Sequence, residues 1–191
     1  MFRFRAAFVA LCAMALLVAA APASAAAGDR APAERGPAAT AVRTAVAAGP
    51  YHIKFYHSDR CVDNPGPSTS NVWLDQWNCV PQSNELWYFD FVAFDGLDYW
   101  YEVRNAYSQK CMNVEQASQS NGAHVIQYSC AGSYWNNQWA LAEVSAGSGW
   151  FWMYPRHSTG CLNVAGGSPD NGAKLIQYNC GFYTNEYVTL Y

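Results

Sequence analysis

Residues 51–191 consist of short apolar and aromatic segments that are split by turns, and no helical period is sustained among them. The stretches Leu97 to Arg104 and Trp150 to Tyr154 are rich in aromatic residues, which favour strands. Asp95-Gly96 and Asn121-Gly122 are dipeptides typical of hairpin turns. The pattern therefore predicts an all-β region built from short strands.

This pattern repeats three times. The ten residues that end at Cys130 match those that end at Cys180 at seven positions. Two sets of cysteines keep a spacing of 50 or 51 residues, and these are Cys61, Cys111 and Cys161, then Cys79, Cys130 and Cys180. About four strands in each copy gives roughly twelve strands, too many for one open sheet and natural for a closed barrel.

The beginning of the chain predicts export from the cytoplasm. Arg3 and Arg5 precede an apolar run from Ala6 to Ala21, and Ala23-Ser24-Ala25 is a small-residue cleavage site. We therefore expect a signal peptide over residues 1–25 and a secreted, extracellular protein that does not insert into a membrane. The apolar run contains Cys12, so six cysteines are left in the remaining chain.

An even number of cysteines in an exported chain predicts disulfides rather than a metal or redox site. Their regular spacing favours pairing within each copy over the fourteen other possible connectivities. The expected disulfides are Cys61–Cys79, Cys111–Cys130 and Cys161–Cys180, and each closes a loop of about 19 residues.

Residues 26–50 are rich in Ala, Pro, Gly and charged residues, and they contain neither an aromatic residue nor a cysteine. This composition predicts a flexible linker or pro-segment in front of a domain at 51–191. The alternative, a helix over Thr40 to Ala48, would offer little apolar surface for docking.

The net charge of the repeated region argues against two classes of binding partner. Residues 51–191 contain six basic and twelve acidic residues, so the net charge of this region is −6. An acidic surface without a basic patch argues against nucleic acid and anionic membranes. No carboxylate cluster has the spacing of a calcium loop, so we expect neither a metal nor another cofactor.

Each copy resembles the ricin B-chain type repeat of the R-type lectins, which also occurs in carbohydrate-binding modules. The family pattern is Cys-apolar-Asp-Val, then an aromatic residue two positions before the second Cys, and then Asn. The matching segments here are Cys61-Val62-Asp63, Cys111-Met112-Asn113-Val114 and Cys161-Leu162-Asn163-Val164. The resemblance implies an all-β fold, a β-trefoil of three internal repeats in which a six-stranded barrel is capped by hairpins.

The resemblance also implies up to three shallow sugar sites. Carried over residue by residue, these sites are Asp63, Trp77 and Asn84; Asn113, Tyr128 and Asn136; and Asn163, Tyr178 and Asn185. Only the first keeps the family's Asp. Burial of the three aromatic residues, and a turn-closing role for the Asn residues, are the structural alternatives. Trp87, Trp139 and Val188 occupy the family's core position.

The sequence departs from the family at one further position. The family often has Gln four residues before the second Cys, where this chain has Asp75, Ile126 and Ile176. Gln76, Gln127 and Gln177 follow one residue later, which in a strand points them to the opposite face. A Pro65-Gly66-Pro67 loop and a one-residue deletion also distinguish the first copy, and they could move Trp77 relative to Asp63.

The expected function is secreted, non-enzymatic carbohydrate binding by a monomer, with a monosaccharide, a polysaccharide or a cell-surface glycan as the partner. The first alternative is a degenerate trefoil that binds or inhibits a protein. The second is an enzyme using the acids Asp90, Asp95, Asp98 and Glu102, although solvated acids are common at a hairpin. The four His residues lack a Ser or Cys in a recognisable nucleophile setting, so no catalytic residue is predicted.

Overall fold

The computed structural model describes residues 41–191, so the predicted signal peptide and residues 26–40 lie outside the described part. The twelve strands are β1 (Ile53–Phe55), β2 (Arg60–Asp63), β3 (Asp75–Asn78), β4 (Trp87–Phe94), β5 (Tyr99–Asn105), β6 (Cys111–Val114), β7 (Val125–Tyr128), β8 (Gln138–Glu143), β9 (Phe151–Pro155), β10 (Gly160–Val164), β11 (Leu175–Asn179) and β12 (Tyr187–Leu190). The predicted strand content of the repeats is confirmed.

Helical structure in the described chain is limited to single 3-10 turns. They are η1 (Ser83–Glu85), η2 (Glu115–Ala117), η3 (Trp135–Asn137), η4 (Ala165–Gly167) and η5 (Thr184–Glu186). Within residues 41–191, no helix has the length and apolar character needed to cross a bilayer.

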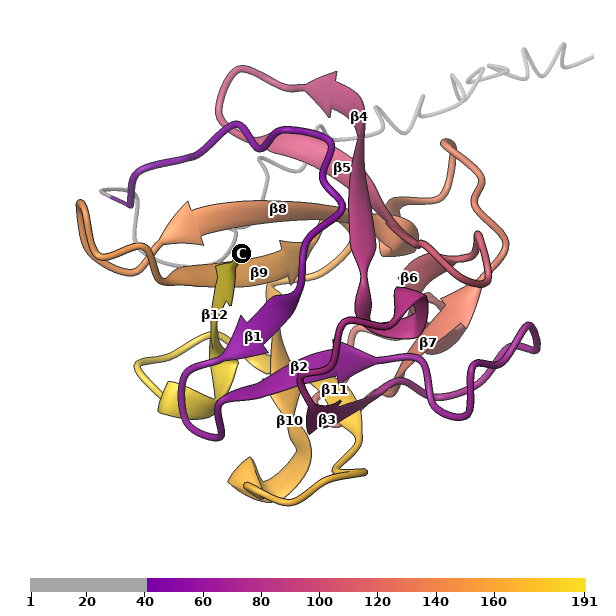
Figure 1. Ribbon diagram of the computed structural model, residues 1–191. Helices are drawn as coiled ribbons and strands as arrows, with labels where there is room; N and C mark the ends of the chain where they lie inside the picture. Colours follow the sequence, from indigo (N-terminus) through magenta and orange to yellow (C-terminus); the bar gives the residue numbers. More distant parts are fainter. Residues whose placement is uncertain (1–40) are drawn as a thin grey trace, which may run out of the picture. The chain divides into compact units, whose positions relative to one another are not determined.

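Six of the strands close a barrel, and three hairpins cap one end of it (Figure 1). Antiparallel pairs link β1 to β12, β12 to β9, β9 to β8, β8 to β5 and β5 to β4. The bridge between Tyr51 and Trp87 connects the start of β4 to the chain just before β1 and completes the circle. The hairpins are β2–β3, β6–β7 and β10–β11. The predicted β-trefoil is confirmed.

The barrel core is filled from all three repeats. Trp87, Trp139 and Val188 are fully buried, as their position in the repeat predicts. The indole N–H of Trp87 donates to the carbonyl of Val62 at 3.1 Å, and that of Trp139 donates to the carbonyl of Met112 at 2.9 Å. A buried indole needs such an acceptor, so these two bonds tie the barrel to the hairpin caps.

The three disulfides are the predicted ones, Cys61–Cys79, Cys111–Cys130 and Cys161–Cys180. Each joins the beginning of one hairpin strand to a cysteine one or two residues after its partner strand. A covalent link within the hairpin fixes the strand that carries the aromatic residue of each repeat, two positions before the second cysteine.

Three buried glutamines connect the repeats in a ring. The amide of Gln76 donates to the carbonyls of Ser168 and Asp170, both at 2.9 Å. Equivalent bonds run from Gln127 to Ser68 and Ser70, and from Gln177 to Ser118 and Ser120. Each glutamine oxygen accepts a serine hydroxyl of its own repeat, from Ser58, Ser108 or Ser158. The shifted glutamines thus point away from the face that carries Asp75, Ile126 and Ile176, as their position in the strands predicts, and fasten each repeat to a neighbour.

The structure differs from the sequence-based expectation before Tyr51. Residues 41–50, here called the N-terminal strap, form no helix and run along the barrel instead. Arg43 pairs with Ala142 in a β-bridge, the amide of Val46 donates to the Tyr101 hydroxyl at 2.8 Å, and the carbonyl of Ala48 accepts the amide of Phe89. These contacts attach residues 41–50 to strands β4, β5 and β8 of the barrel.

A buried ion pair also holds the N-terminal strap, in addition to the packing of Ala41 and Val46 against the core. The Nε atom of Arg43 lies 2.6 Å from Oδ1 of Asp98, and the same oxygen accepts the hydroxyl of Tyr154 at 2.7 Å. The side chain of Arg43 is 9% exposed and that of Asp98 is 1% exposed. A carboxylate buried this deeply needs a cation and a hydrogen-bond donor, and the strap supplies the cation.

Candidate functional site

The same feature recurs at each hairpin cap, where an aromatic ring stands on the surface. Strand register places Trp77 opposite Cys61, Tyr128 opposite Cys111 and Tyr178 opposite Cys161. The three residues are 46%, 42% and 42% exposed. The alternative of burial for these aromatics is therefore wrong. Three half-exposed rings at equivalent positions form platforms against which a ligand can lie flat.

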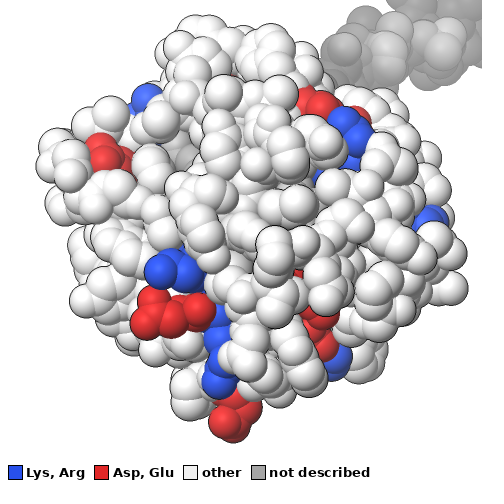
Figure 2. Space-filling model, in the orientation of Figure 1, with Lys and Arg blue, Asp and Glu red and all other residues white. Residues whose placement is uncertain are grey.

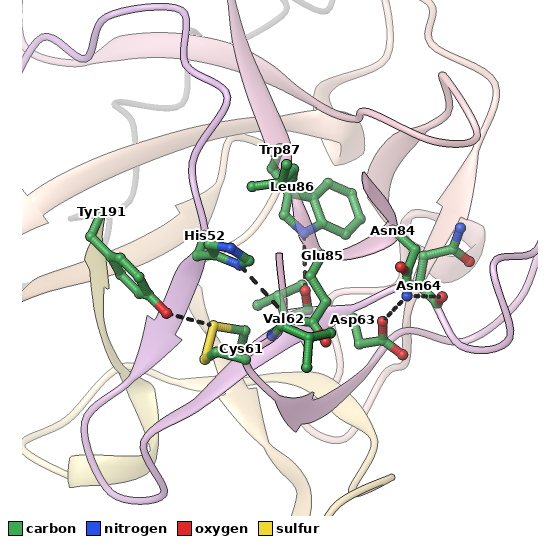
Figure 3. Close-up of polar contacts among 12 residues, drawn as sticks. His52, Cys61, Val62, Asp63, Asn64, Asn84, Glu85, Leu86, Trp87 and Tyr191 are labelled. Carbon is green, nitrogen blue, oxygen red and sulfur yellow. Dashed lines mark hydrogen bonds and ion pairs between the residues drawn. A yellow bond between two sulfur atoms is a disulfide. The ribbon is translucent and has the colours of Figure 1, made fainter. Parts of the chain in front are cut away.

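Beside the first ring lies a polar pair in a largely buried setting. The Asn84 amide nitrogen lies 2.5 Å from Oδ1 of Asp63 and 3.3 Å from the carbonyl of Asn64, as Figure 3 shows. Asp63 ends β2, and Asn84 belongs to the turn η1, which leads into β4. Both amide protons of Asn84 are used to position it, so its oxygen remains an acceptor beside the second oxygen of Asp63.

The second and third repeats build the same arrangement from two asparagines. Asn136 donates to Oδ1 of Asn113 and to the carbonyl of Val114, both at 2.9 Å. Asn185 donates to Oδ1 of Asn163 at 2.7 Å and to the carbonyl of Val164 at 3.1 Å. The two polar residues predicted for each site are thus brought together in all three repeats. The asparagines hold one another as well as the backbone, and do not act as simple turn closers.

Shallow pockets accompany the first two sets. The pocket of the second repeat is about 460 Å³ and contains Asn113, Tyr128, Tyr134 and Asn136 in its lining. The pocket of the first repeat is about 290 Å³ and is bordered by the Pro65 to Pro67 loop as well as by Asp63, Trp77 and Asn84. The unusual loop of the first repeat therefore forms a rim and does not displace Trp77 from Asp63.

A second flanking position recurs in the three repeats and was not predicted from the sequence. Tyr134 lies two residues before Asn136, Tyr183 lies two residues before Asn185, and both tyrosines are exposed. The first repeat has Gln82 at this position, two residues before Asn84, and Gln82 also lines its pocket. Counting back from the site asparagine, rather than forward from the second cysteine, would have identified all three residues, because the loop length varies between the copies.

The first site differs from the others electrostatically. Asp63 and Asp75 are direct partners across β2 and β3, where the other repeats pair Asn113 with Ile126 and Asn163 with Ile176. Burial and then repulsion from Asp75 raise the pKa of Asp63 to about 6. Burial also raises the pKa of Asp75, although the Lys174 ammonium, 2.8 Å from its Oδ2 atom, acts in the opposite direction.

The dense acids of the β4–β5 hairpin have structural partners. Asp90 pairs with Arg104, and Glu102 accepts the amide of Asn137. Asp95 accepts the backbone amides of the turn together with the Trp100 indole, and Asp98 holds Arg43. These partners give each of the four acids a structural role in or beside the hairpin.

Charge and possible metal ligands add no further site in residues 41–191. In Figure 2 the visible face carries few charges, and basic atoms lie beside acidic ones without forming a continuous patch. Two groups of described residues gather three potential metal ligands, one around Cys61 and one around Cys111 and Cys130. Their sulfurs are in disulfides, so they offer no thiolate to an ion.

Comparisons with known proteins agree with this geometry. The sequence model described as ricin-type beta-trefoil lectin domain-like matches residues 41–128 and 84–178. The designed three-fold symmetric protein ThreeFoil is 33% identical with a TM-score of 0.67, and the alignment covers 73% of this chain and 96% of ThreeFoil. No curated protein matches the chain.

Two natural structures share the fold at lower identity. The Macrolepiota procera ricin B-like lectin, solved in complex with lactose, is 14% identical with a TM-score of 0.63, over 77% of this chain and 97% of the lectin. The exo-β-1,3-galactanase 1,3Gal43A from Clostridium thermocellum is 22% identical with a TM-score of 0.67, and the match spans 74% of this chain but 29% of the enzyme. The three-fold repeat, the closed barrel and the matched sequence model together place this chain in the ricin-type β-trefoil lectin domain-like family.

Proposed function

We propose that the protein is a secreted, non-enzymatic monomer that binds carbohydrate through three shallow sites. The observation that carries the proposal is the threefold recurrence of an exposed aromatic ring beside a fixed polar pair, at Trp77, Tyr128 and Tyr178. A core needs no exposed ring at three equivalent positions, whereas a sugar-binding surface does.

The chemistry of a pyranose fits this arrangement. One face of the ring presents C–H bonds that can stack on an aromatic surface, while the hydroxyls at its edge donate to oxygen acceptors. The amide oxygens of Asn84, Asn136 and Asn185 provide such acceptors, and Asp63 adds a charge-assisted one in the first repeat. Each site buries few ligand atoms and binds weakly alone, so a polysaccharide that reaches several sites gains avidity.

The competing function is binding or inhibition of a protein. The exposed Phe91 and Phe94 on β4 favour it, since protein interfaces are enriched in aromatic residues. Protein binding would use one irregular surface and would not require the same aromatic ring and polar pair in all three repeats. The sugar-binding proposal accounts for all three.

The test is binding of residues 26–191 to a glycan array and to insoluble polysaccharides. We expect binding, a marked loss in an Asp63→Ala/Trp77→Ala variant that keeps its circular dichroism spectrum, and no release of reducing sugar from a bound polysaccharide. Failure to bind any glycan would reject the proposal in favour of a protein partner, and release of reducing sugar would reject the non-enzymatic part.

Sugar binding at the first site is expected to weaken as the pH falls through about 6, because protonation of Asp63 removes its charge-assisted acceptor. A Tyr128→Ala/Tyr178→Ala variant isolates this site, and its affinity for a neutral sugar ligand should fall roughly tenfold from about pH 8 to about pH 5. Titration calorimetry measures the change. Adding Asp63→Asn should give weaker binding with a smaller pH dependence, to which Glu85, whose pKa burial raises to about 7, still contributes, while a flat profile with Asp63 intact would contradict the assignment.

A further inference from the structure

The pocket of the first repeat contains a pair of facing carboxylates that the sites of the other two repeats lack. Where the other repeats have an asparagine and an isoleucine, it has Asp63 and Asp75, paired directly across two strands. Glu85 also contributes to the lining of this pocket. Lys174 is the cation bonded to this group, and it neutralises one carboxylate. The pocket therefore carries excess negative charge beside the Trp77 ring.

One carboxylate oxygen of Asp75 has no hydrogen-bond donor among the described residues. Asp75 is 3% exposed, and it lines the pocket. Lys174 bonds to its Oδ2 atom, but no residue in the described chain hydrogen-bonds to its Oδ1 atom. Two ionised carboxylates cannot donate to each other, so the donor to Oδ1 is a shared proton, a water molecule or a group supplied by a ligand.

A neutral sugar satisfies this pocket incompletely. A hydroxyl can donate one proton to one carboxylate, but it leaves the charge of both groups in a poorly solvated place. A protonated amine donates up to three hydrogen bonds and brings the opposite charge. Trp77 favours an amino sugar for two reasons. Its face accepts the C–H side of a pyranose, and it also attracts a cation.

We propose that the first-repeat pocket binds a sugar that carries a free, protonated amino group, namely a hexosamine unit of a deacetylated amino-sugar polymer. The ammonium group lies between Asp63 and Asp75, replaces any proton they share, and donates to Oδ1 of Asp75, while the ring stacks on Trp77. This inference rests on the proposed carbohydrate-binding function and assigns the ligand class of one of its sites. The second and third sites, with neutral Asn–Ile pairs, bind uncharged sugars.

The test compares glucosamine trimer with its fully N-acetylated counterpart, by calorimetry at about pH 7 on the Tyr128→Ala/Tyr178→Ala background. We expect the free amine to bind at least roughly tenfold more tightly, with an affinity that falls as salt is added. The matched variant is Asp63→Asn/Asp75→Ile, which recreates the pair found in the other repeats and suits their packing. It should lose this preference, so that the free and acetylated trimers bind with equal affinity.

Two further measurements separate the proposal from general attraction to an acidic protein. Lys174→Ala should bind the glucosamine trimer more tightly, because a competing cation is removed from Asp75. A trilysine peptide, which has the charge but no pyranose ring, should bind much more weakly than the glucosamine trimer. Equal binding of the free and acetylated trimers, no effect of Asp63→Asn/Asp75→Ile, or equal binding of trilysine would each overturn the inference. Neutral-glycan binding by the unmodified chain would survive those results, whereas a chain that binds no glycan fails both proposals.

Discussion

Replacing Arg43 by alanine is expected to lower the free energy of unfolding by about 3–5 kcal/mol, because it leaves Asp98 buried without its cation. After the replacement only the hydroxyl of Tyr154 faces the carboxylate oxygen that Arg43 had contacted. Chemical denaturation followed by tryptophan fluorescence measures the change. A chain that starts at Tyr51 should show a loss at least as large, since the whole strap is then missing.

The matched control is Lys54→Ala. Lys54 also pairs with an aspartate, Asp59, but that carboxylate is 82% exposed and hydrated. A surface pair of this kind contributes about 0–1 kcal/mol. Adding Asp98→Asn to Arg43→Ala should recover part of the lost stability, because it removes the unpaired charge. If Arg43→Ala costs no more than Lys54→Ala, the strap is not fastened by this ion pair.

Replacing Trp77, Tyr128 and Tyr178 together by alanine is expected to reduce binding to an insoluble polysaccharide by about 10²–10⁴-fold. Each replacement removes one stacking platform and weakens one site, but the combined loss is larger because simultaneous attachment at several sites is abolished. Depletion assays with increasing polysaccharide measure the apparent affinity. Each single replacement should have a much smaller effect than the triple one.

The half-exposed rings contribute little to the core, so the triple variant should keep its circular dichroism spectrum. Phe91→Ala/Phe94→Ala is the matched control, because it also removes exposed aromatics from the β4–β5 hairpin but leaves all three sites intact. Polysaccharide binding that survives in the triple variant and is lost in this control would place the binding surface on the hairpin, as the protein-binding alternative requires.

Much of the fold could be predicted because its signals are local and repeated. The segments Leu97 to Arg104 and Trp150 to Tyr154 correspond to β5 and β9 within two residues at each end. Gly122 of the predicted Asn121-Gly122 turn has a positive φ of 84°, which glycine adopts without steric strain. The regular cysteine spacing was sufficient to choose one disulfide connectivity.

The strap was missed for a physical reason. Its docking depends on one arginine meeting a carboxylate 55 residues away, and composition cannot reveal such a contact. The excess charge of the first site was missed in the same way. Asp75 was visible as a departure from the family pattern, but its pairing with Asp63 and Lys174 emerges only from strand register and from contact between the first and third repeats.

The ring of glutamines allows the chain to be opened at a different point without loss of the contacts between the repeats. Repeat one is fastened to repeat three, two to one, and three to two, so the contacts form a cycle without a first or last member. His52 and Tyr191 exchange backbone hydrogen bonds, so the two ends of the barrel chain are also neighbours. A circular permutant that joins these ends by a short linker and opens in the Ser145 to Gly149 turn, between β8 and β9, would preserve every one of these glutamine contacts. The cycle of contacts between the repeats therefore defines the trefoil, and the fold does not depend on where the termini lie.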